Sequence, residues 1–445
     1  MAATLADSGI PLCVAEIVGL TAVQSSAITL VDDPATLRLS LSAAYNGKTK
    51  RVRNMPVMPI VSPLARMAEV AADPDAYALA WKQAHPGGKV AGVLPMNFPE
   101  ELLHAAGFLP IVIQENSEPD SEGRVILAEF YCGYTRNLAD QAVKGKLAHY
   151  DAYFVADHCV QLLGAADVMR YAQPEIPIYF GQFIASMSES STNGKVRGEM
   201  GRIVREVERS AGAPIDQDRL RNSIRLYNED RSLLRKVFDA RRDGRLHLPA
   251  KQIQDLVKSS MIMEKAEHVA LLKELLAHGL GTQAATGTVK LHLSGHFCHA
   301  PKQELLDLIE ECGAEVVNDD LYHGRRYITT DVREDVDPID ALTEWYFDRN
   351  VNVPCPTRVQ HDADWDTYLS NAVNASGADG VIVLMAKFCE PHMLLYPELR
   401  KMMDEREIPY LLIETEHEGL PMESIRTRVE ALVERISRRP ARVAG

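Results

Sequence analysis

Gly380-Val-Ile-Val-Leu-Met-Ala-Lys-Phe-Cys-Glu-Pro-His392 is the stretch of sequence that decides the fold. Its five consecutive apolar residues, Val381 to Met385, show no alternation of polar and apolar side chains. Such a run predicts a central strand covered on both faces, as in a parallel sheet. Pro391 then opens a run from Met393 to Asp404 that predicts a helix. We therefore expect Cys389 at the carboxyl end of a strand and before a helix N-terminus, where α/β sheets bind ligands and a thiolate is favoured.

Length and composition narrow the class of protein. A chain of 445 residues predicts two or three domains, each with its own core. The formal net charge of −14 and the pI near 5.5 argue against nucleic acid or an anionic membrane as the main partner. No stretch of the sequence is apolar over the length that is needed to span a bilayer. The acidic residue Asp7 lies where a signal peptide would carry basic residues, so we expect a cytoplasmic protein. Seven scattered cysteines, an odd number, favour a reducing compartment over a disulfide framework.

We expect four segments along the chain. Residues 1–85, interrupted by prolines, predict an N-terminal extension that packs on the body or on a partner. Residues 86–195 predict a first α/β domain, 196–285 a mainly helical connector, and 286–445 a second α/β domain. The alternation of strands and helices predicts two doubly wound parallel-sheet domains, with a site in the crevice between them.

The first α/β domain is predicted to begin with a β-α-β unit. Lys89 to Leu94 predicts a strand, Pro99 to Gly107 a short helix, and Phe108 to Gln114 the next strand. A small-residue turn that starts at Cys132 is expected to lead into a helix from Asn137 to Leu147.

The pattern around Cys389 is repeated in this domain. Ala152 to Ala156 predicts a buried strand, Asp157-His158-Cys159 stands at its carboxyl end, and Val160 to Arg170 predicts the helix that follows.

Later segments of the chain are predicted to be helical in the connector and α/β in the second domain. The predicted helices of the connector are Arg197 to Ser210, Gln217 to Arg241 and Gln252 to His278, followed by a hinge at Gly279 to Gly287 and a long irregular stretch from Leu321 to Trp365 in the second domain.

Three cysteines share an unusual placement. Cys159 and Cys389 end buried strands, and Cys132 precedes a helix. Buried core thiols are the commoner explanation, and no CxxC pattern marks a closed zinc site. The shared placement instead favours a common site, because three thiolates from separate elements suit an iron–sulfur cluster with one open coordination position. The residues alone leave both interpretations open.

Other candidates rank below these three. His292, His296, Cys298 and His299 crowd the end of a predicted strand, but successive side chains on a strand point to opposite faces, which argues against a zinc site. Cys298 alone is a lower-ranked candidate beside the cluster. Cys13, Cys312 and Cys355 are expected to be unrelated to the site: an N-terminal core contact, a packing residue at a helix end, and a loop residue between two prolines. No Walker phosphate loop, no GxGxxG after a strand and no G-x-S-x-G elbow is present, so intrinsic nucleotide use has no support.

Several motifs together resemble a known family. They are Pro99-Glu-Glu-Leu-Leu-His-Ala-Ala-Gly-Phe-Leu-Pro110, Asp157-His-Cys159, Gly313-Ala-Glu-Val-Val-Asn-Asp-Asp320, Gly324-Arg-Arg-Tyr327, Lys387-Phe-Cys-Glu-Pro391, Ile413-Glu414 and Arg426-Thr-Arg-Val-Glu430. From about Trp81 to Ile436 the chain resembles the benzoyl-CoA reductase and 2-hydroxyacyl-CoA dehydratase family. Trp81-Lys-Gln-Ala, His104-Ala-Ala-Gly107 and Phe297-Cys298 are most similar to the smaller cluster-bearing subunit, the C-type subunit, of ATP-dependent benzoyl-CoA reductase.

The resemblance implies a site and a set of partners. It implies a [4Fe–4S] cluster held by Cys132, Cys159 and Cys389, and a proton-moving role for Glu101, which matches the family's Pro-x-Glu position; on physics alone, Glu101 is a helix N-terminal charge. It also implies a homologous cluster-bearing subunit and an ATP-hydrolysing iron–sulfur activator as partners. The implied function is to pass low-potential electrons to the ring of benzoyl-CoA in anaerobic aromatic degradation. The alternatives are a subunit of a radical 2-hydroxyacyl-CoA dehydratase and a non-catalytic electron-transfer or scaffold subunit.

Overall fold

The computed structural model describes residues 26–31, 38–45, 48–51, 62–246, 248–277, 289–361 and 363–438. The chain divides into two compact units, Met1–Ser62 and Pro63–Gly445. In the first unit, β1 (Ser26–Val31), β2 (Arg38–Tyr45) and β3 (Lys48–Arg51) form an antiparallel sheet in that order. Cys13 and the hinge predicted at 279–287 lie outside the described residues. The domain boundaries expected at residues 85, 195 and 285 stay predictions.

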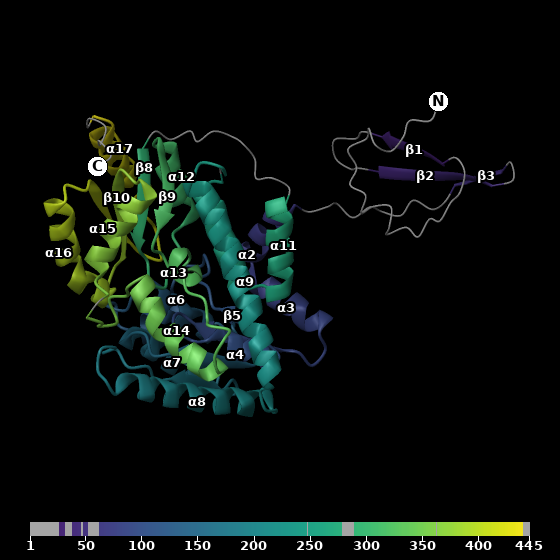
Figure 1. Cartoon of the computed structure of the whole chain (residues 1–445), viewed down its shortest axis with the longest axis horizontal. Helices are drawn as coiled ribbons and strands as arrows, with labels where there is room; N and C mark the ends of the chain where they lie inside the picture. The colour runs from purple at the N-terminus through teal and green to yellow at the C-terminus, as the bar shows by residue number, and fades with distance from the viewer. Residues whose placement is uncertain are drawn as a thin grey trace. The chain divides into compact units, whose positions relative to one another are not determined.

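Two four-stranded parallel sheets form the framework of the second unit (Figure 1). The first has the order β5-β4-β6-β7 and the second the order β11-β10-β8-β9. Each half therefore places its first strand between its second and third strands, so one topology occurs twice. The strands are β4 (Lys89–Leu94), β5 (Phe108–Val112), β6 (Ala152–Ala156), β7 (Ile178–Gly181), β8 (Val289–Gly295), β9 (Ala314–Asp319), β10 (Gly380–Ala386) and β11 (Tyr410–Thr415). The predicted fold class, α/β with two parallel-sheet domains, is confirmed.

Helices flank both sheets and connect them. The long α9 contacts α4 of the first half as well as α13 and β9 of the second, so it bridges the two halves. The helices of this unit are α2 (Pro63–Ala72), α3 (Pro74–Ala84), α4 (Glu100–Ala105), α5 (Glu122–Ile126), α6 (Gly133–Val143), α7 (Val160–Ala172), α8 (Thr192–Ala211), α9 (Gln217–Arg242), α10 (Ala250–Ser260), α11 (Lys265–Ala277), α12 (Gln303–Glu311), α13 (Arg325–Ile328), α14 (Pro338–Asn352), α15 (Trp365–Ser376), α16 (Glu390–Glu405) and α17 (Met422–Ser437).

The strand β10 is buried along its whole length, as its sequence predicts. Val381 and Val383 belong to the core cluster that includes Trp365 of α15 and Leu399 of α16. The alternate residues, such as Ile382, belong to a second cluster formed with α12 and α17. Helices on both faces of the sheet explain why the strand shows no polar alternation.

Three helical regions differ from the sequence prediction. The helix after Cys132 begins at Gly133, four residues earlier than expected, because the small-residue turn is its first turn. The helix predicted over 252–278 is two helices, α10 and α11, separated at residues 261–264. The stretch predicted to be irregular contains α13 and α14; the Asp337 carboxylate caps α14 by accepting from two backbone N–H groups.

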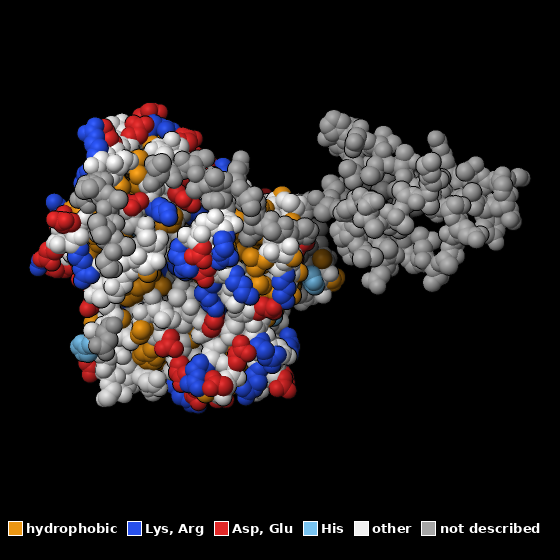
Figure 2. Space-filling view, turned by 45° about the horizontal axis from the view of Figure 1, so that its top comes forward, with side chains coloured by type: hydrophobic (Ala, Val, Ile, Leu, Met, Phe, Trp, Pro, Cys, Tyr) orange, Lys and Arg blue, Asp and Glu red, His pale blue; other side chains and the backbone are white. Residues whose placement is uncertain are grey.

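The surface carries charges of both signs. On the face in Figure 2, acidic and basic side chains are interspersed over the lower part of the body. Within the described ranges, none of the helices is both long enough and apolar enough to traverse a lipid bilayer.

Candidate functional site

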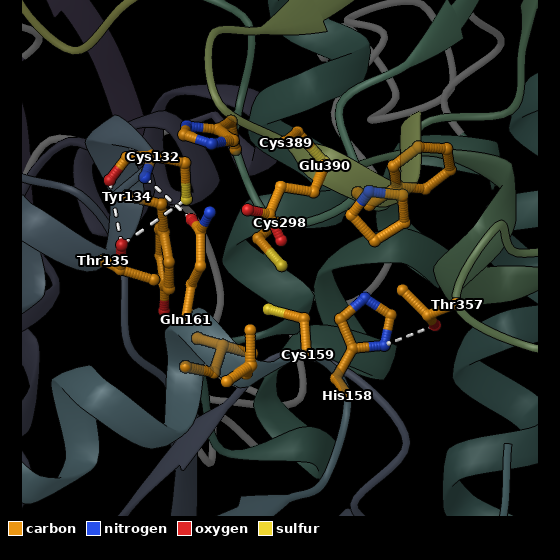
Figure 3. A pocket seen from close by; sticks show the side chains of 15 residues that line it. Cys132, Tyr134, Thr135, His158, Cys159, Gln161, Cys298, Thr357, Cys389 and Glu390 are labelled. Carbon is orange, nitrogen blue, oxygen red and sulfur yellow. Dashed lines mark hydrogen bonds between the residues drawn. The ribbon is translucent and has the colours of Figure 1, made fainter. Parts of the chain in front are cut away.

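Four cysteines from both halves line one cavity of about 230 Å³ (Figure 3). Cys132 and Cys159 come from the first half, and Cys298 and Cys389 from the second. Each of Cys159, Cys298 and Cys389 follows the carboxyl end of a parallel strand, namely β6, β8 and β10. The structure thus brings together the three cysteines that the sequence singled out and the lower-ranked Cys298.

Three of these cysteines occupy the same position relative to a helix. Cys132 is the N-cap residue of α6, Cys159 of α7 and Cys389 of α16. The N-terminus of a helix carries partial positive charge and unpaired N–H groups, so three such ends facing one cavity favour negative charge there. This charge pattern suits thiolates and an anionic group bound by them.

The side chain of Gln161 in the first turn of α7 ties the cysteine-bearing segments together. Its Oε1 accepts a hydrogen bond of 2.8 Å from the backbone N–H of Cys132. Its Nε2 donates to the carbonyl oxygens of Phe388, at 2.8 Å, and Phe130, at 3.3 Å. Because Phe388 precedes Cys389, one amide holds segments of both halves at the cavity.

The segment that carries Cys298 is anchored at several points. Gly295 has φ +106°, and a Cβ there would lie 2.2 Å from the carbonyl oxygen of Leu384, so only glycine allows the chain to pass β10 this closely. The next residue, His296, is also in the left-handed region, at φ +44°, and its Nε2 lies 2.7 Å from Thr415 Oγ1. The carboxylate of Asp320 accepts from the N–H of Gly295 at 2.8 Å.

Cys132 differs electrostatically from the other thiols. Burial acts to raise its pKa, but the hydrogen bond and the charge of His299 outweigh burial and hold the pKa below its usual value. Burial acts to lower the pKa of His299, whereas Glu115 and Cys132 raise it to about 10. Nδ1 of His299 lies 3.3 Å from Glu115, whose other oxygen lies 3.2 Å from His417 Nδ1. Glu115, His299 and the thiol of Cys132 therefore form a row across the two halves.

The remaining thiols of the cavity are held in the neutral form. Burial, followed by the neighbouring sulfur of Cys132, raises the pKa of Cys159 to about 12 and that of Cys389 further still. Burial and the three other sulfurs raise the pKa of Cys298 well above its usual value. Neutral thiols avoid the mutual repulsion of several anions in a small space.

His158 presents a neutral imidazole at the wall of the cavity. Burial, followed by the cations Arg358, Arg349 and Arg326, lowers its pKa far below the usual range. Arg349 donates to Asn97 Oδ1 at 3.2 Å, so the amide nitrogen of Asn97 faces His158 Nδ1, at 3.4 Å. The hydroxyl oxygen of Thr357 lies 3.3 Å from the same Nδ1, so this ring nitrogen has two polar neighbours.

The donor set fits a cluster better than a single ion. Among the described residues, no group of three His, Cys, Asp or Glu side chains is arranged to hold one metal ion. The ligands of one ion must all lie about 2.0–2.3 Å from a common point. The cysteines instead surround a cavity several times larger than the ~30 Å³ share of one water molecule. In residue type the four thiols match the ligands of iron–sulfur clusters, which are cysteine thiolates.

The histidines and the cysteine that the sequence offered as a possible zinc site do not point to a common position. Nε2 of His292 lies 3.7 Å from Asp320, His296 faces Thr415, and His299 faces Glu115. Cys312 is the C-cap residue of α12, away from the lining of the cavity. Cys355 lies closer to the site than the sequence indicated: its sulfur is 3.1 Å from the Oγ1 of Thr357, which does line the cavity.

Glu101 lies outside the lining residues of the cavity. Its carboxylate is buried and accepts a 2.9 Å hydrogen bond from Arg231 Nη1. The neighbouring Glu100 accepts from the hydroxyl of Tyr327 at 2.9 Å, and burial, opposed by Lys265, raises its pKa to about 7. A proton-moving role for Glu101 stays a prediction, and Glu100 is a second buried carboxyl beside it.

The sequence did not predict the contacts by which polar residues hold the cysteine-bearing segments in place. Glu115, Gln161 and His299 act through contacts between distant segments, which no local pattern announces. Only His299 carried a signal, since it lies next to Cys298 at the end of a predicted strand.

Fold and site together define a class: an α/β protein with two parallel sheets and a thiol-lined cavity where their strands end. The family model of the 2-hydroxyglutaryl-CoA dehydratase D-component matches residues 95–436, which is most of the chain. The chain belongs to this family. The matched range includes all four cysteines of the cavity.

Relatives of the chain include both reductase and dehydratase subunits. The chain is 24% identical over 362 residues to the C subunit of benzoyl-CoA reductase of Thauera aromatica, covering 80% of this chain and 93% of that protein. It is 27% identical over 373 residues to the beta subunit of lactoyl-CoA dehydratase of Anaerotignum propionicum, covering 83% and 98%. It is 23% identical over 386 residues to the beta subunit of (R)-2-hydroxyglutaryl-CoA dehydratase of Acidaminococcus fermentans, covering 85% and 100%.

Proposed function

We propose that the chain is the iron–sulfur subunit of an ATP-dependent aromatic acyl-CoA reductase, with benzoyl-CoA as substrate. The observation that carries the proposal is the cavity into which cysteines of both halves converge. Cys132, Cys159 and Cys389 would hold a [4Fe–4S] cluster, which supplies one-electron chemistry at low potential. The similarity to the C subunit of benzoyl-CoA reductase supports the choice of substrate.

The residues of the chain have definable roles in this function. The N-termini of α6, α7 and α16 stabilise negative charge in the cavity, and Gln161 fixes the spacing of the cysteine-bearing segments. Buried lining residues such as Tyr134 and Phe297 would limit the access of water to the inner part of the cavity. Glu101, or the adjacent Glu100 with its raised pKa, would move protons.

The proposed function includes two kinds of partner protein, an activator that supplies electrons and a homologous subunit. Reduction of an aromatic ring is steeply uphill, so the proposed function includes a separate ATP-hydrolysing activator as the source of electrons, and the lack of a phosphate loop in the sequence agrees with this. Exposed apolar side chains flank the cysteines: Val160 follows Cys159 and is 65% exposed, and Phe388 precedes Cys389. Exposed apolar groups beside a site are typical of a surface that a partner covers, and we assign this one to the homologous subunit in a cytoplasmic complex.

The test mixes the purified complex with benzoyl-CoA, activator, ATP and a strong reductant under anaerobic conditions. The proposal predicts a dienoyl-CoA product. Turnover of only a 2-hydroxyacyl-CoA would overturn it and establish the second candidate, a radical 2-hydroxyacyl-CoA dehydratase subunit, which the 27% identity to the beta subunit of lactoyl-CoA dehydratase favours.

The substitution Glu101→Gln distinguishes a non-catalytic scaffold subunit from both a reductase subunit and a dehydratase subunit. The amide keeps the size of the side chain and can still accept from Arg231. Loss of complex turnover without loss of iron supports a proton-moving role. Full turnover would leave the chain as an electron-transfer or scaffold subunit.

A further inference from the structure

We infer that Glu100, and not Glu101, is the residue of this chain that takes up and releases a proton. Lys265 and Tyr327 set the charge of its carboxyl. The inference rests on the proposed function, which leaves the proton-moving role open between two neighbouring carboxyls. Both belong to the first turn of α4, but their side chains have different partners, and these partners decide which of the two can change its charge.

Glu101 is fixed as an anion by a buried ion pair. Its Oε1 accepts a hydrogen bond of 2.9 Å from Nη1 of Arg231, and both side chains are less than one-tenth exposed. Arg231 is itself held in place, because its Nη2 donates to Asn228 Oδ1 at 2.7 Å. A guanidinium keeps its proton at every pH at which proteins are folded, so a protonated Glu101 would leave a buried cation without its partner.

Lys265, the other buried cation of this region, is paired with Asp230. Its Nζ lies 3.7 Å from Asp230 Oδ2, and both side chains are 2% exposed. The same Nζ donates to Ser260 Oγ at 3.0 Å, and Ser260 donates in turn to Asp230 at 2.5 Å. The other oxygen of Asp230 lies 2.5 Å from Nδ1 of His268. The charge of Lys265 is therefore balanced by a carboxylate other than Glu100.

Glu100 is the carboxyl that these two ion pairs leave over. Its Oε2 accepts a 2.9 Å hydrogen bond from the hydroxyl of Tyr327, and within the described part of the chain no Lys or Arg side chain forms an ion pair with it. A buried carboxyl with a neutral donor and no cation of its own is destabilised in its charged form. Burial raises the pKa of Glu100 to about 7, against the opposing charge of Lys265. Both forms are thus populated near neutral pH, as a proton carrier requires.

The charged and titratable groups that face Glu100 come from several elements. They are Lys265 of α11, Arg231 and Tyr227 of α9, Tyr327 of α13, Glu101 of α4 itself, and Tyr322. The ammonium of Lys265 lies over the rings of Tyr227, at 4.5 Å, and Tyr327, at 5.9 Å. On release, the proton passes to a base that reaches the carboxyl, and the carboxylate keeps the Tyr327 hydrogen bond and gains the attraction of Lys265. Uptake of a proton from water restores the neutral carboxyl.

Glu100 begins α4 directly after a segment that contacts the wall of the cysteine cavity. Asn97, three residues before it, has its amide nitrogen 3.4 Å from His158 Nδ1, and His158 lines the cavity. The proton carrier therefore lies near the site where the proposed reaction consumes protons.

The experiment records infrared spectra of the anaerobically purified full chain as a function of pH. A protonated carboxyl has a C=O band that a carboxylate lacks, so the band of Glu100 should disappear with a midpoint near pH 7. The variants are Glu100→Gln, Glu101→Gln and Lys265→Met. Asp255→Asn is the matched control, because burial raises the pKa of this α10 carboxyl to about 6 and it accepts from Gln303 instead.

Glu100→Gln should lose the band that titrates near pH 7, whereas Glu101→Gln and Asp255→Asn should keep it. Lys265→Met should shift the midpoint to higher pH, because the carboxylate loses a nearby cation, and Glu101→Gln should shift it to lower pH. A band that survives in Glu100→Gln, or a midpoint that Lys265→Met leaves unchanged, overturns the inference. A wild type without such a band overturns it even if a variant fails to fold.

Turnover of the complex with benzoyl-CoA, activator, ATP and reductant separates two failures. A complex that contains Glu100→Gln should keep its iron and lose turnover by about 100-fold or more. Unchanged turnover of this variant overturns the inference while the proposed function stands. A wild-type complex that forms no dienoyl-CoA overturns the proposed function, while the infrared assignment of the proton to Glu100 stands.

Discussion

At the scale of single residues, the cavity depends on polar side chains that join segments lying far apart in the sequence. The amide of Gln161 makes one hydrogen bond to the segment of Cys132 and one to the segment of Cys389. A third reaches the carbonyl of Phe130. A side chain that joins three segments restricts all of them at once, so its loss affects the spacing of the cysteines more than any one bond suggests.

Gln161→Ala removes these three hydrogen bonds and should lower the free energy of unfolding by about 1–3 kcal/mol. Gln161→Glu keeps the acceptor for the Cys132 N–H but turns a carboxylate oxygen toward two carbonyls, so it should be at least as damaging. Urea unfolding and iron content check both changes. The control is Gln182→Ala at an exposed glutamine; equal losses in Gln161→Ala and the control would contradict the role of Gln161.

Glu100 makes stability depend on pH. Burial raises its folded pKa to about 7 from an ordinary value near 4.5, so the fold favours the protonated carboxyl. The stabilisation of the fold that comes from this raised pKa is fully present below pH 4.5 and is lost as pH rises through 7. The loss lowers the free energy of unfolding by an amount on the order of 3 kcal/mol. Glu100→Gln, which can still accept from Tyr327, should stabilise the protein at about pH 8 and change little at about pH 5. Thermal melts at the two pH values test this, and equal effects at both would contradict it.

Residue types and strand ends made the three principal cysteines candidates from the sequence, and the family resemblance singled them out from the seven. Cys389 and Cys159 could be predicted because a buried strand ends just before each of them. The row formed by Glu115, His299 and Cys132 could not be predicted, because its members come from different halves and meet only through tertiary packing.

At the scale of elements, the position of α6 decides where Cys132 points. The helix begins at Gly133, and a Cβ there would lie 2.8 Å from the backbone nitrogen of His417. The glycine thus allows the segment after β11 to approach the N-terminus of α6. Thr135 donates to the carbonyl of Cys132 at 2.9 Å and completes the first turn.

Gly133→Ala should destabilise the protein by about 1–3 kcal/mol, since the added methyl group meets backbone that cannot move freely. Gly198→Ala is the matched control, because Gly198 lies within α8 and has open space where the methyl group would go. The control should be neutral or stabilising by about 0.5–1 kcal/mol. Chemical unfolding of both variants measures the difference, and a neutral Gly133→Ala would show that the close approach does not matter.

The missed elements have physical causes. Buried strands were predictable within one or two residues because continuous apolar runs with sharp ends leave few alternatives. The helix α14 was missed although its sequence carries helix signals: Asp337 and Pro338 at its start, and buried side chains such as Leu342 and Tyr346 at a spacing of three to four residues. The break between α10 and α11 carries no proline or glycine; its residues Met261 to Met263 are buried instead.

At the scale of the whole second unit, folding and cofactor binding should be coupled. The cavity is lined by residues of both halves, and the hydrogen bond from Gln161 to the carbonyl of Phe388 joins its walls. A group bound by both halves stabilises the folded state but not the unfolded chain.

Removal of iron by a chelator under anaerobic conditions should therefore lower the Tm of the wild type. The same treatment should leave the Tm of Cys159→Ala unchanged, because this variant lacks one ligand and should hold little iron from the start. Calorimetry before and after chelation checks the prediction, and an equal fall in both proteins would point to an effect unrelated to the cavity.

The central claim is that the four-cysteine cavity holds an iron–sulfur cluster. Iron and sulfide analysis of the anaerobically purified chain, combined with EPR after reduction, tests it most directly. We predict a brown protein with about four irons and four sulfides per chain and an EPR signal that Cys389→Ala abolishes or alters. A colourless, correctly folded protein with no iron or sulfide above background would contradict it.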